Sequence, residues 1–169
     1  MLSSENPLAK AFFMAKKEKK EIDNSLAKNK KAFAFYEILE KIEAGVELTG
    51  GEVKSIRGGK ANLKGGFIDV HAEIPWMNNV HISRYKYDMS GTDPLRKRKI
   101  LLHKKEITEI ESKIKTKGIT AIPLEMYDKK GLIKVLVGIC KGKKTFDRRE
   151  DLKKKSQEID IRRALKYRP

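Results

Sequence analysis

The chain has 169 residues, enough for one domain with its own hydrophobic core and no need of disulfides. Lys and Arg number 39 against 23 Asp and Glu, so the formal net charge is +16. This surplus predicts a polyanionic partner, either nucleic acid or an anionic membrane surface. The single cysteine, Cys140, excludes an internal disulfide and a cysteine-rich zinc site. We expect a protein of a reducing compartment, the cytoplasm.

The positive charge is concentrated at the two ends of the chain. Residues 1–31 and 141–169 hold 11 of the 16 net charges and few large apolar side chains. Such segments do not bury enough apolar surface to fold without a partner. We therefore expect a flexible basic extension over 1–25, one domain over 26–144, and a basic tail over 145–169.

The first half of the expected domain combines strands with one short helix. Residues 1–28 show only weak helical patterning. The mixed pattern over 33–48 fits either a strand or a helix. A long, bent strand is the favoured prediction, because Phe33 and Phe35 alternate with Ala32, Ala34 and Tyr36 at its start. Thr49 and Glu52 have capping-box spacing, which predicts a helix over 51–57 that ends at two glycines.

Two hairpins and a second helix are expected in the rest of the domain. The apolar runs 67–70 and 76–82 predict the first hairpin, and a loop over 83–99 follows it. Three isoleucines recur at helical spacing within 101–117, which predicts an amphipathic helix. The runs 119–127 and 132–140 predict the second hairpin, with its turn at 128–131.

These elements do not alternate regularly between strand and helix, which argues against a parallel sheet. A closed or nearly closed antiparallel barrel satisfies the edges of short strands best. The predicted fold class is therefore mostly β with some α: an OB-like antiparallel β-barrel with flanking short helices and disordered basic tails.

No motif for catalysis is present. Residues 138–145 come near a phosphate-binding loop, but three residues separate the glycines instead of four, and a second Lys precedes the Thr. His81 and His103 adjoin apolar residues, which favours a structural role. The acidic residues near 150 lie among basic ones, as in a self-paired helix start. We expect no enzyme activity, no metal and no cofactor.

RNA is the partner that the charge and the expected barrel favour. Basic clusters of this kind contact phosphates and fix the position of the protein on RNA. They comprise Lys28, Lys30 and Lys31, then Arg57 and Lys60, then 96–99 and 141–144. Tyr85, Tyr87 and Phe146 either stack on bases or pack on the barrel.

A series of short motifs then occurs in a recognisable order. The motifs are NKKA at 29–32, EAG at 43–45, GEVKSIR at 51–57, GKAN at 59–62, HIS at 81–83, DPLRKRK at 93–99, KV at 134–135, GICKGKK at 138–144 and DRR at 147–149. The series resembles the small protein B (SmpB) family, the tmRNA-binding proteins of bacterial trans-translation, over about residues 26–166.

The resemblance implies a protein that binds the tRNA-like domain of tmRNA and helps deliver alanyl-tmRNA to stalled ribosomes. The nascent peptide is then tagged for degradation. The C-terminal tail would form a helix in the empty decoding site and mRNA channel of the small ribosomal subunit. Elongation factor Tu and alanyl-tRNA synthetase would be indirect partners through tmRNA. We expect a monomer with no membrane partner.

The resemblance also implies roles for individual residues. Glu43, Leu101 and Lys134 fall at tmRNA-binding positions. Glu43 would accept hydrogen bonds from a base or a 2′-hydroxyl, or orient a Lys; otherwise it forms a salt bridge with Lys134. Further expected tmRNA contacts are Asn29, Lys30, Lys31, Arg57, Lys60, Asn62, Arg96, Arg98 and Lys99. Expected contacts to the decoding centre and channel are Phe146, Asp147, Arg148, Arg149, Lys153, Lys154, Lys155, Ala164, Leu165 and Lys166.

The chain departs from the family pattern at two places. Ala34 and Phe35 precede Tyr36 where members often carry His and an acid, and Phe146 stands where some carry His. The alternative function is a constitutive OB-type ribosomal protein or a general RNA-binding protein, which would sediment with ribosomes without tmRNA. An RNA-cleaving enzyme would need clustered metal-binding carboxylates, and a membrane-surface role would need a stronger amphipathic stripe than 8–20 provides.

Overall fold

The structure is a computed structural model that describes residues 25–143, 156, 157 and 159. The expected extension over 1–25, apart from Ser25, and nearly all of the tail over 145–169 lie outside these residues. The strands are β1 (Ser25–Lys28), β2 (Tyr36–Val46), β3 (Ala61–Asn62), β4 (Phe67–His71), β5 (Ile74–Asn78), β6 (His81–Ile82), β7 (Arg98–Leu101), β8 (Ile119–Lys129) and β9 (Leu132–Gly142). The helices are α2 (Lys30–Phe35), α3 (Gly50–Arg57) and α4 (Lys104–Ile114).

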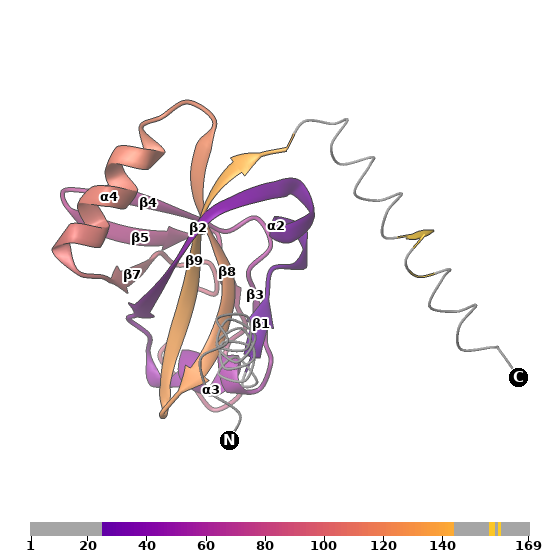
Figure 1. Cartoon of the computed structure of the whole chain (residues 1–169). Coiled ribbons are helices and arrows are strands. Elements are labelled where there is room, and N and C mark those ends of the chain that lie inside the picture. Colours follow the sequence, from indigo (N-terminus) through magenta and orange to yellow (C-terminus); the bar gives the residue numbers. More distant parts are fainter. Residues whose placement is uncertain (1–24, 144–155, 158, 160–169) are drawn as a thin grey trace, which may run out of the picture.

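The strands form a closed antiparallel barrel, which confirms the expected mostly β fold with short flanking helices (Figure 1). The strand order is β1-β8-β4-β5-β7-β2-β9, and β9 pairs again with β8 to close the ring. Strands β8 and β2 pair with β9 over most of their length, whereas β1 pairs only with β8. Closure leaves the long strands without a free edge, the arrangement that protects sheets from edge-to-edge association.

Two apolar clusters lie on opposite sides of the barrel wall. The main core inside the barrel holds buried side chains such as Ile42, Met77, Ile100 and Val135. The smaller cluster packs α2 onto the outer side of the wall and holds Ala32, Ile122, Leu124 and Cys140. Leu124 packs directly over Gly138, where an added Cβ would lie 2.7 Å from Leu124 Cδ1. Helix α2 contributes the buried Ala32 to this cluster, and Phe33 packs against it.

The capping box at the start of α3 is confirmed. The backbone N–H of Thr49 donates to Glu52 Oε2 over 2.8 Å, and the backbone N–H of Glu52 donates to Thr49 Oγ1 over 3.4 Å. The helix spans Gly50–Arg57 and ends where Gly58 and Gly59 follow. Both the start and the end of this helix follow from local sequence.

The start of the expected strand 33–48 is wrong, because Phe33 and Phe35 lie in helix α2. Asn29 caps this helix: its side chain accepts a hydrogen bond from the Ala32 N–H and donates to the carbonyls of Leu63 and Pro123. These long-range bonds fix one helical turn where local alternation suggested a strand. Strand β1, just before Asn29, was not expected either.

The other corrections concern where elements begin and end. The first hairpin joins β4 to β5 through Ala72 and Glu73, both at positive φ, while His81–Ile82 leaves it to pair with β3. Leu101 pairs with Gly45 in the barrel, so β7 shortens the expected loop and α4 begins at Lys104. The β8–β9 hairpin is confirmed and extends to Lys129 and Leu132. Among the described residues, no helix is long and apolar enough to cross a membrane.

Candidate RNA-binding surface

Glu43, Leu101 and Lys134 lie together on the outer surface of the barrel. Gly45 of β2 pairs with Leu101 of β7 on one side and with Lys134 of β9 on the other. Directly paired residues, and residues two apart in a strand, point to the same face of a sheet. The buried residues Ile42 and Ala44 point inward, so Glu43 points outward beside the row. Three residues far apart in sequence thus share one exposed patch.

Glu43 is the centre of a polar cluster on this patch. The hydroxyl of Tyr127 donates to Glu43 Oε2 over 2.6 Å, and Lys129 Nζ donates to the same oxygen over 2.9 Å. The hydrogen bonds from Tyr127 and Lys129 lower the pKa of Glu43 by more than its partial burial raises it. The carboxylate is therefore charged at neutral pH and keeps acceptor capacity for a further donor, since a carboxylate has about four acceptor sites.

The partner of Glu43 differs from the sequence expectation. The ion pair forms with Lys129, and Lys134 is a nearby positive charge that adds a smaller stabilising effect on the carboxylate. Sequence reasoning did not single out Tyr127 and Lys129. Both residues lie near the end of β8, two positions apart, so strand alternation places them on one face. Bringing that face beside Glu43 requires the β8–β9 register, which local sequence does not give.

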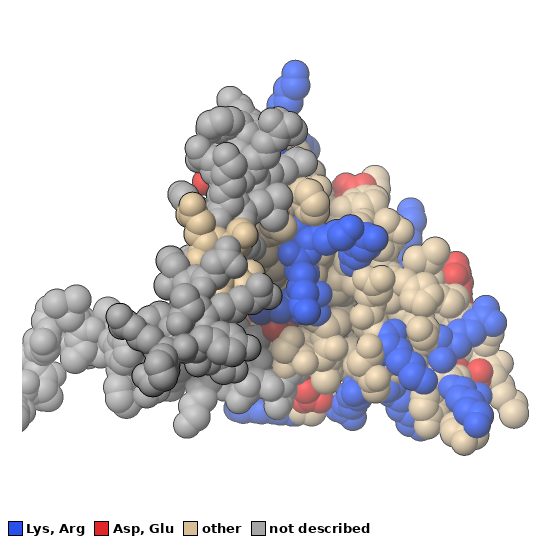
Figure 2. All heavy atoms as spheres, turned by 90° about the vertical axis from the view of Figure 1, so that its right-hand side faces the viewer, with Lys and Arg blue, Asp and Glu red and all other residues tan. Residues whose placement is uncertain are grey.

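The expected contacts on and before α2 divide into one structural and two exposed residues. Asn29 is 5% exposed, and its side chain is used by the helix cap and by two carbonyls. Lys30 and Lys31 are exposed on the helix. Figure 2 shows the face that carries α2, β1 and β3, with many Lys and Arg side chains and few acids in view. Phosphate contact is open to the two lysines.

The segment between α3 and β3 presents exposed donors beside a hairpin turn. Arg57 is exposed and donates from Nε to Asp128 Oδ2 over 3.2 Å and from Nη2 to the Gly131 carbonyl over 2.9 Å. It thereby ties α3 to the β8–β9 turn. Lys60 is exposed, and the exposed Asn62 accepts a hydrogen bond from the Lys64 N–H.

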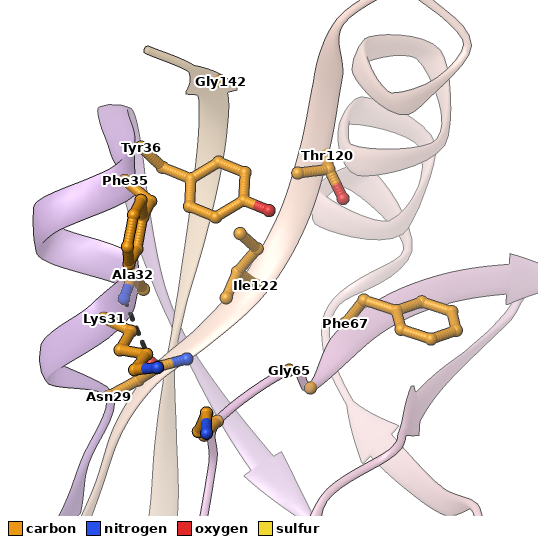
Figure 3. Close-up of a pocket in the computed structure, with 12 residues that line it drawn as sticks. Asn29, Lys31, Ala32, Phe35, Tyr36, Gly65, Phe67, Thr120, Ile122 and Gly142 are labelled. Atoms are coloured by element: carbon orange, nitrogen blue, oxygen red, sulfur yellow. Dashed lines mark hydrogen bonds between the residues drawn. The ribbon is translucent and has the colours of Figure 1, made fainter. Parts of the chain in front are cut away.

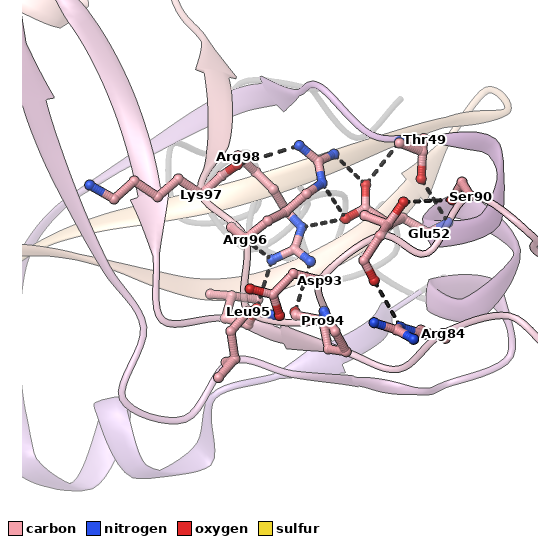
Figure 4. A network of polar contacts seen from close by, with 12 residues as sticks. Thr49, Glu52, Arg84, Ser90, Asp93, Pro94, Leu95, Arg96, Lys97 and Arg98 are labelled. Atoms are coloured by element: carbon pink, nitrogen blue, oxygen red, sulfur yellow. Dashed lines mark hydrogen bonds and ion pairs between the residues drawn. The ribbon is translucent and has the colours of Figure 1, made fainter.

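Arg96 and Arg98 form a buried network with Glu52 (Figure 4). Arg98 is 0% exposed; its Nε donates to Glu52 Oε1 over 2.8 Å and its Nη1 to the Val80 carbonyl over 2.7 Å. Arg96 donates to both oxygens of Glu52. The position of Arg98 argues against direct RNA contact, because RNA does not reach a fully buried guanidinium. Arg96 is half-buried, and so is Lys99 on β7.

The loop after β6 carries two tyrosines whose rings contact each other. The rings of Tyr85 and Tyr87 meet edge to face with centroids 5.7 Å apart, and Lys54 lies 5.1 Å from the Tyr85 centroid. Tyr87 is 74% exposed. Tyr85 thus contacts Lys54 of α3, and Lys86 lies 5.5 Å from the centroid of the exposed Tyr87 ring. Stacking of either tyrosine on a base stays a prediction.

The described part of the chain contains no group of three or more His, Cys, Asp or Glu able to hold a metal ion. Burial raises the pKa of the Cys140 thiol to about 11, so it stays protonated and unreactive at neutral pH. All the residues expected at the decoding centre and channel, from Phe146 to Lys166, lie outside the described residues.

Comparison with known proteins identifies close relatives. A family model described as "SmpB protein" matches residues 26–167. The SsrA-binding protein of Ligilactobacillus salivarius is 51% identical over 154 residues, covering 90% of this chain and 98% of that protein. The SsrA-binding protein of Lacticaseibacillus casei is 49% identical over 156 residues, covering 92% and 99%. A solved structure described as "tmRNA-SmpB: a journey to the center of the bacterial ribosome" matches with a TM-score of 0.61 and 42% identity, covering 70% of this chain and 84% of that one.

Proposed function

The chain belongs to the SmpB family, and on that premise we propose that it binds the tRNA-like domain of tmRNA and helps deliver alanyl-tmRNA to stalled ribosomes. The observation that carries the proposal is the match of the family over 26–167, which covers the barrel except for Ser25 at the start of β1. Relatives named SsrA-binding proteins, aligned over nearly their full lengths, support the same RNA partner. The proposed delivery takes place on the ribosome, in the cytoplasm.

The barrel would combine sequence-independent and selective contacts. Exposed Lys30, Lys31 and Lys60 supply attraction to phosphates, which positions the RNA without reading it. The Glu43 cluster supplies selectivity. A carboxylate gains nothing from a phosphate, and the RNA groups that can donate a hydrogen bond to it are a base edge or a 2′-hydroxyl. Leu101, 52% exposed beside Gly45, adds an apolar contact surface on the same patch.

The tail would act on the ribosome rather than on tmRNA. We propose that Asp147, Arg148 and Arg149 act at the decoding centre and that Lys153, Lys154, Lys155 and 164–166 lie in the mRNA channel. Removal of residues 146–169 should then leave affinity for the tRNA-like domain unchanged and abolish peptide tagging. Retention of tagging by the shortened protein would contradict this role of the tail.

The proposed function is binding alone, with no catalytic step by the protein itself. The direct test is a filter-binding titration at about 0.15 M salt, the physiological level. It compares the tRNA-like domain of tmRNA with an ordinary tRNA and a generic stem-loop RNA. We expect a preference for the tRNA-like domain of at least about a hundredfold, or about 2.7 kcal/mol. Equal affinity for all three would instead indicate a general RNA-binding protein.

A further inference from the structure

A groove of about 590 Å³ lies beside α2, well away from the Glu43 patch. Figure 3 shows Phe35 and Tyr36 along one side, Gly65 and Phe67 along the other, and Thr120 and Ile122 of β8 between them. Its volume falls within the range of about 300–1,000 Å³ that small-ligand sites occupy.

The groove and the Glu43 patch lie at opposite ends of one pair of strands. Tyr36, which lines the groove, pairs with Gly142, whereas Gly45 of the patch pairs with Lys134. Nine residues of β2 separate the two ends, about 30 Å along the strand at roughly 3.3 Å per residue. One nucleotide therefore cannot contact both places.

Two lysines at the groove face each other. Lys31 of α2 and Lys64 before β4 both line the groove and are exposed. Within residues 25–143, neither forms an ion pair with an acidic side chain. The neighbouring ammonium of Lys64 lowers the pKa of Lys31. Like charges held together destabilise the free protein, and an anion placed between them would relieve the repulsion.

Exposed aromatic rings lie in the same groove. Phe35 is 40% exposed and Phe67 is 44% exposed, although both are large apolar side chains. Aromatic faces beside a positively charged channel are the usual combination for unpaired nucleotides, because the rings stack on any base while the cations hold the phosphate.

We propose that this groove binds one unpaired nucleotide of RNA, with its phosphate between Lys31 and Lys64 and its base against the rings of Phe35 and Phe67. The nucleotide comes from tmRNA or from ribosomal RNA, so the inference rests on the proposed function for its source. The chemistry of the groove is the same for both.

The test measures the affinity of Lys64→Ala and Phe67→Ala for three probes: the tRNA-like domain, small ribosomal subunits, and a single-stranded oligoadenylate. Phe67→Tyr retains the ring. Lys105→Ala removes the same charge from an exposed site on α4 that does not line the groove. Thermal unfolding of each variant checks that it is folded, and Lys64→Ala should be no less stable than the wild type because a repulsion is removed.

We expect Lys64→Ala and Phe67→Ala each to weaken oligoadenylate binding about tenfold, the effect of losing one stacked or phosphate contact. The same loss should appear with the tRNA-like domain or with the ribosomal subunits. The probe that shows the loss identifies the RNA that supplies the nucleotide. Phe67→Tyr should stay within about twofold of the wild type. The salt dependence of Lys64→Ala should be shallower by about 0.7 in log–log slope, unlike that of Lys105→Ala.

Equal affinities of Lys64→Ala, Phe67→Ala and Lys105→Ala for every probe would overturn the groove assignment, even if the wild type strongly prefers the tRNA-like domain. A wild type with no such preference, whose groove variants still lose oligoadenylate binding, would leave the groove assignment in place and contradict the proposed function instead.

Discussion

Glu52 and Glu43 are two glutamates with similar partners and opposite surroundings. Both accept hydrogen bonds from cationic side chains, but the Glu52 side chain is 6% exposed and that of Glu43 is 37% exposed. Glu52 holds the fully buried Arg98, whereas Glu43 holds Lys129, whose side chain is 43% exposed. Breaking a buried pair leaves an uncompensated charge, while an exposed pair exchanges easily with water. Burial therefore assigns Glu52 to the fold and leaves Glu43 available to a partner.

The largest effect should come from Glu52→Ala. Arg98 would remain buried without its counter-charge, so the free energy of unfolding should fall by about 3–5 kcal/mol. Urea denaturation followed by circular dichroism measures the change. Glu37→Ala, which removes an exposed acid from β2, is the matched control and should stay within about 0.5 kcal/mol. Equal unfolding midpoints for the two variants would remove the distinction between the two glutamates.

Acid should weaken the Glu52 network through the same charge. Burial raises the pKa of Glu52, but hydrogen bonds from Arg96, the Thr49 N–H and Arg98 outweigh it, so the pKa lies below its ordinary 4.5. The carboxylate thus adds stability above the unfolded-state pKa, and that stability is lost as pH falls through the lower folded-state pKa. The stability difference between wild type and Glu52→Gln should shrink from about pH 5 downward. A difference that grew with acid would contradict this sign.

Thr49→Ala should have a smaller effect, because it removes one half of the capping box and leaves the Glu52 ion pairs in place. The expected loss is about 1 kcal/mol of unfolding free energy. Thr49→Ser keeps the hydroxyl that accepts the Glu52 N–H and serves as the control. If Thr49→Ser lost as much as Thr49→Ala, packing of the threonine methyl would account for the loss instead of the cap.

The smallest effect on stability, and a clear effect on binding, should come from Glu43→Gln. An exposed ion pair contributes about 0–1 kcal/mol, so unfolding should change little. Affinity for the tRNA-like domain should fall about tenfold, because a charged acceptor is replaced by a neutral amide. Glu37→Gln makes the same change in net charge on the same strand. Because loss of an acid makes the protein more positive, Glu37→Gln should bind RNA as tightly as the wild type or slightly more tightly. If Glu37→Gln weakened binding as much as Glu43→Gln, the loss would not be specific to the Glu43 cluster.

Local sequence predicted those elements whose ends depend on neighbouring residues. The capping box of α3 and the β8–β9 hairpin followed from patterns within a few positions. Helix α2 did not, because its position depends on Asn29 bonds to Leu63 and Pro123, 34 and 94 residues away. The same limit applies to the surface. Glu43 was identified through resemblance, but its partners Tyr127 and Lys129, 84 and 86 residues away, needed the strand register.

The groove at α2 shows the same dependence on the fold. Lys31 was among the expected RNA contacts, since it belongs to a basic cluster in sequence. Lys64 and Phe67 were not, because no local pattern brings them to α2. Gly66 helps to place them: an added Cβ there would lie 2.6 Å from Val80 Cγ2, so the chain packs closely at this point. Composition and runs of basic residues thus identify a basic segment. The fold is needed to show which other residues join that segment in one surface.

The most direct test of this account combines two measurements on one variant, Glu43→Ala with Lys134→Ala. The first is urea unfolding, and the second is the ratio of affinities for the tRNA-like domain of tmRNA and an ordinary tRNA. The account predicts an unfolding free energy within about 1 kcal/mol of the wild type and a clear loss of preference for the tRNA-like domain. A folded variant with the full wild-type preference would contradict it, because selectivity would then come from another part of the chain.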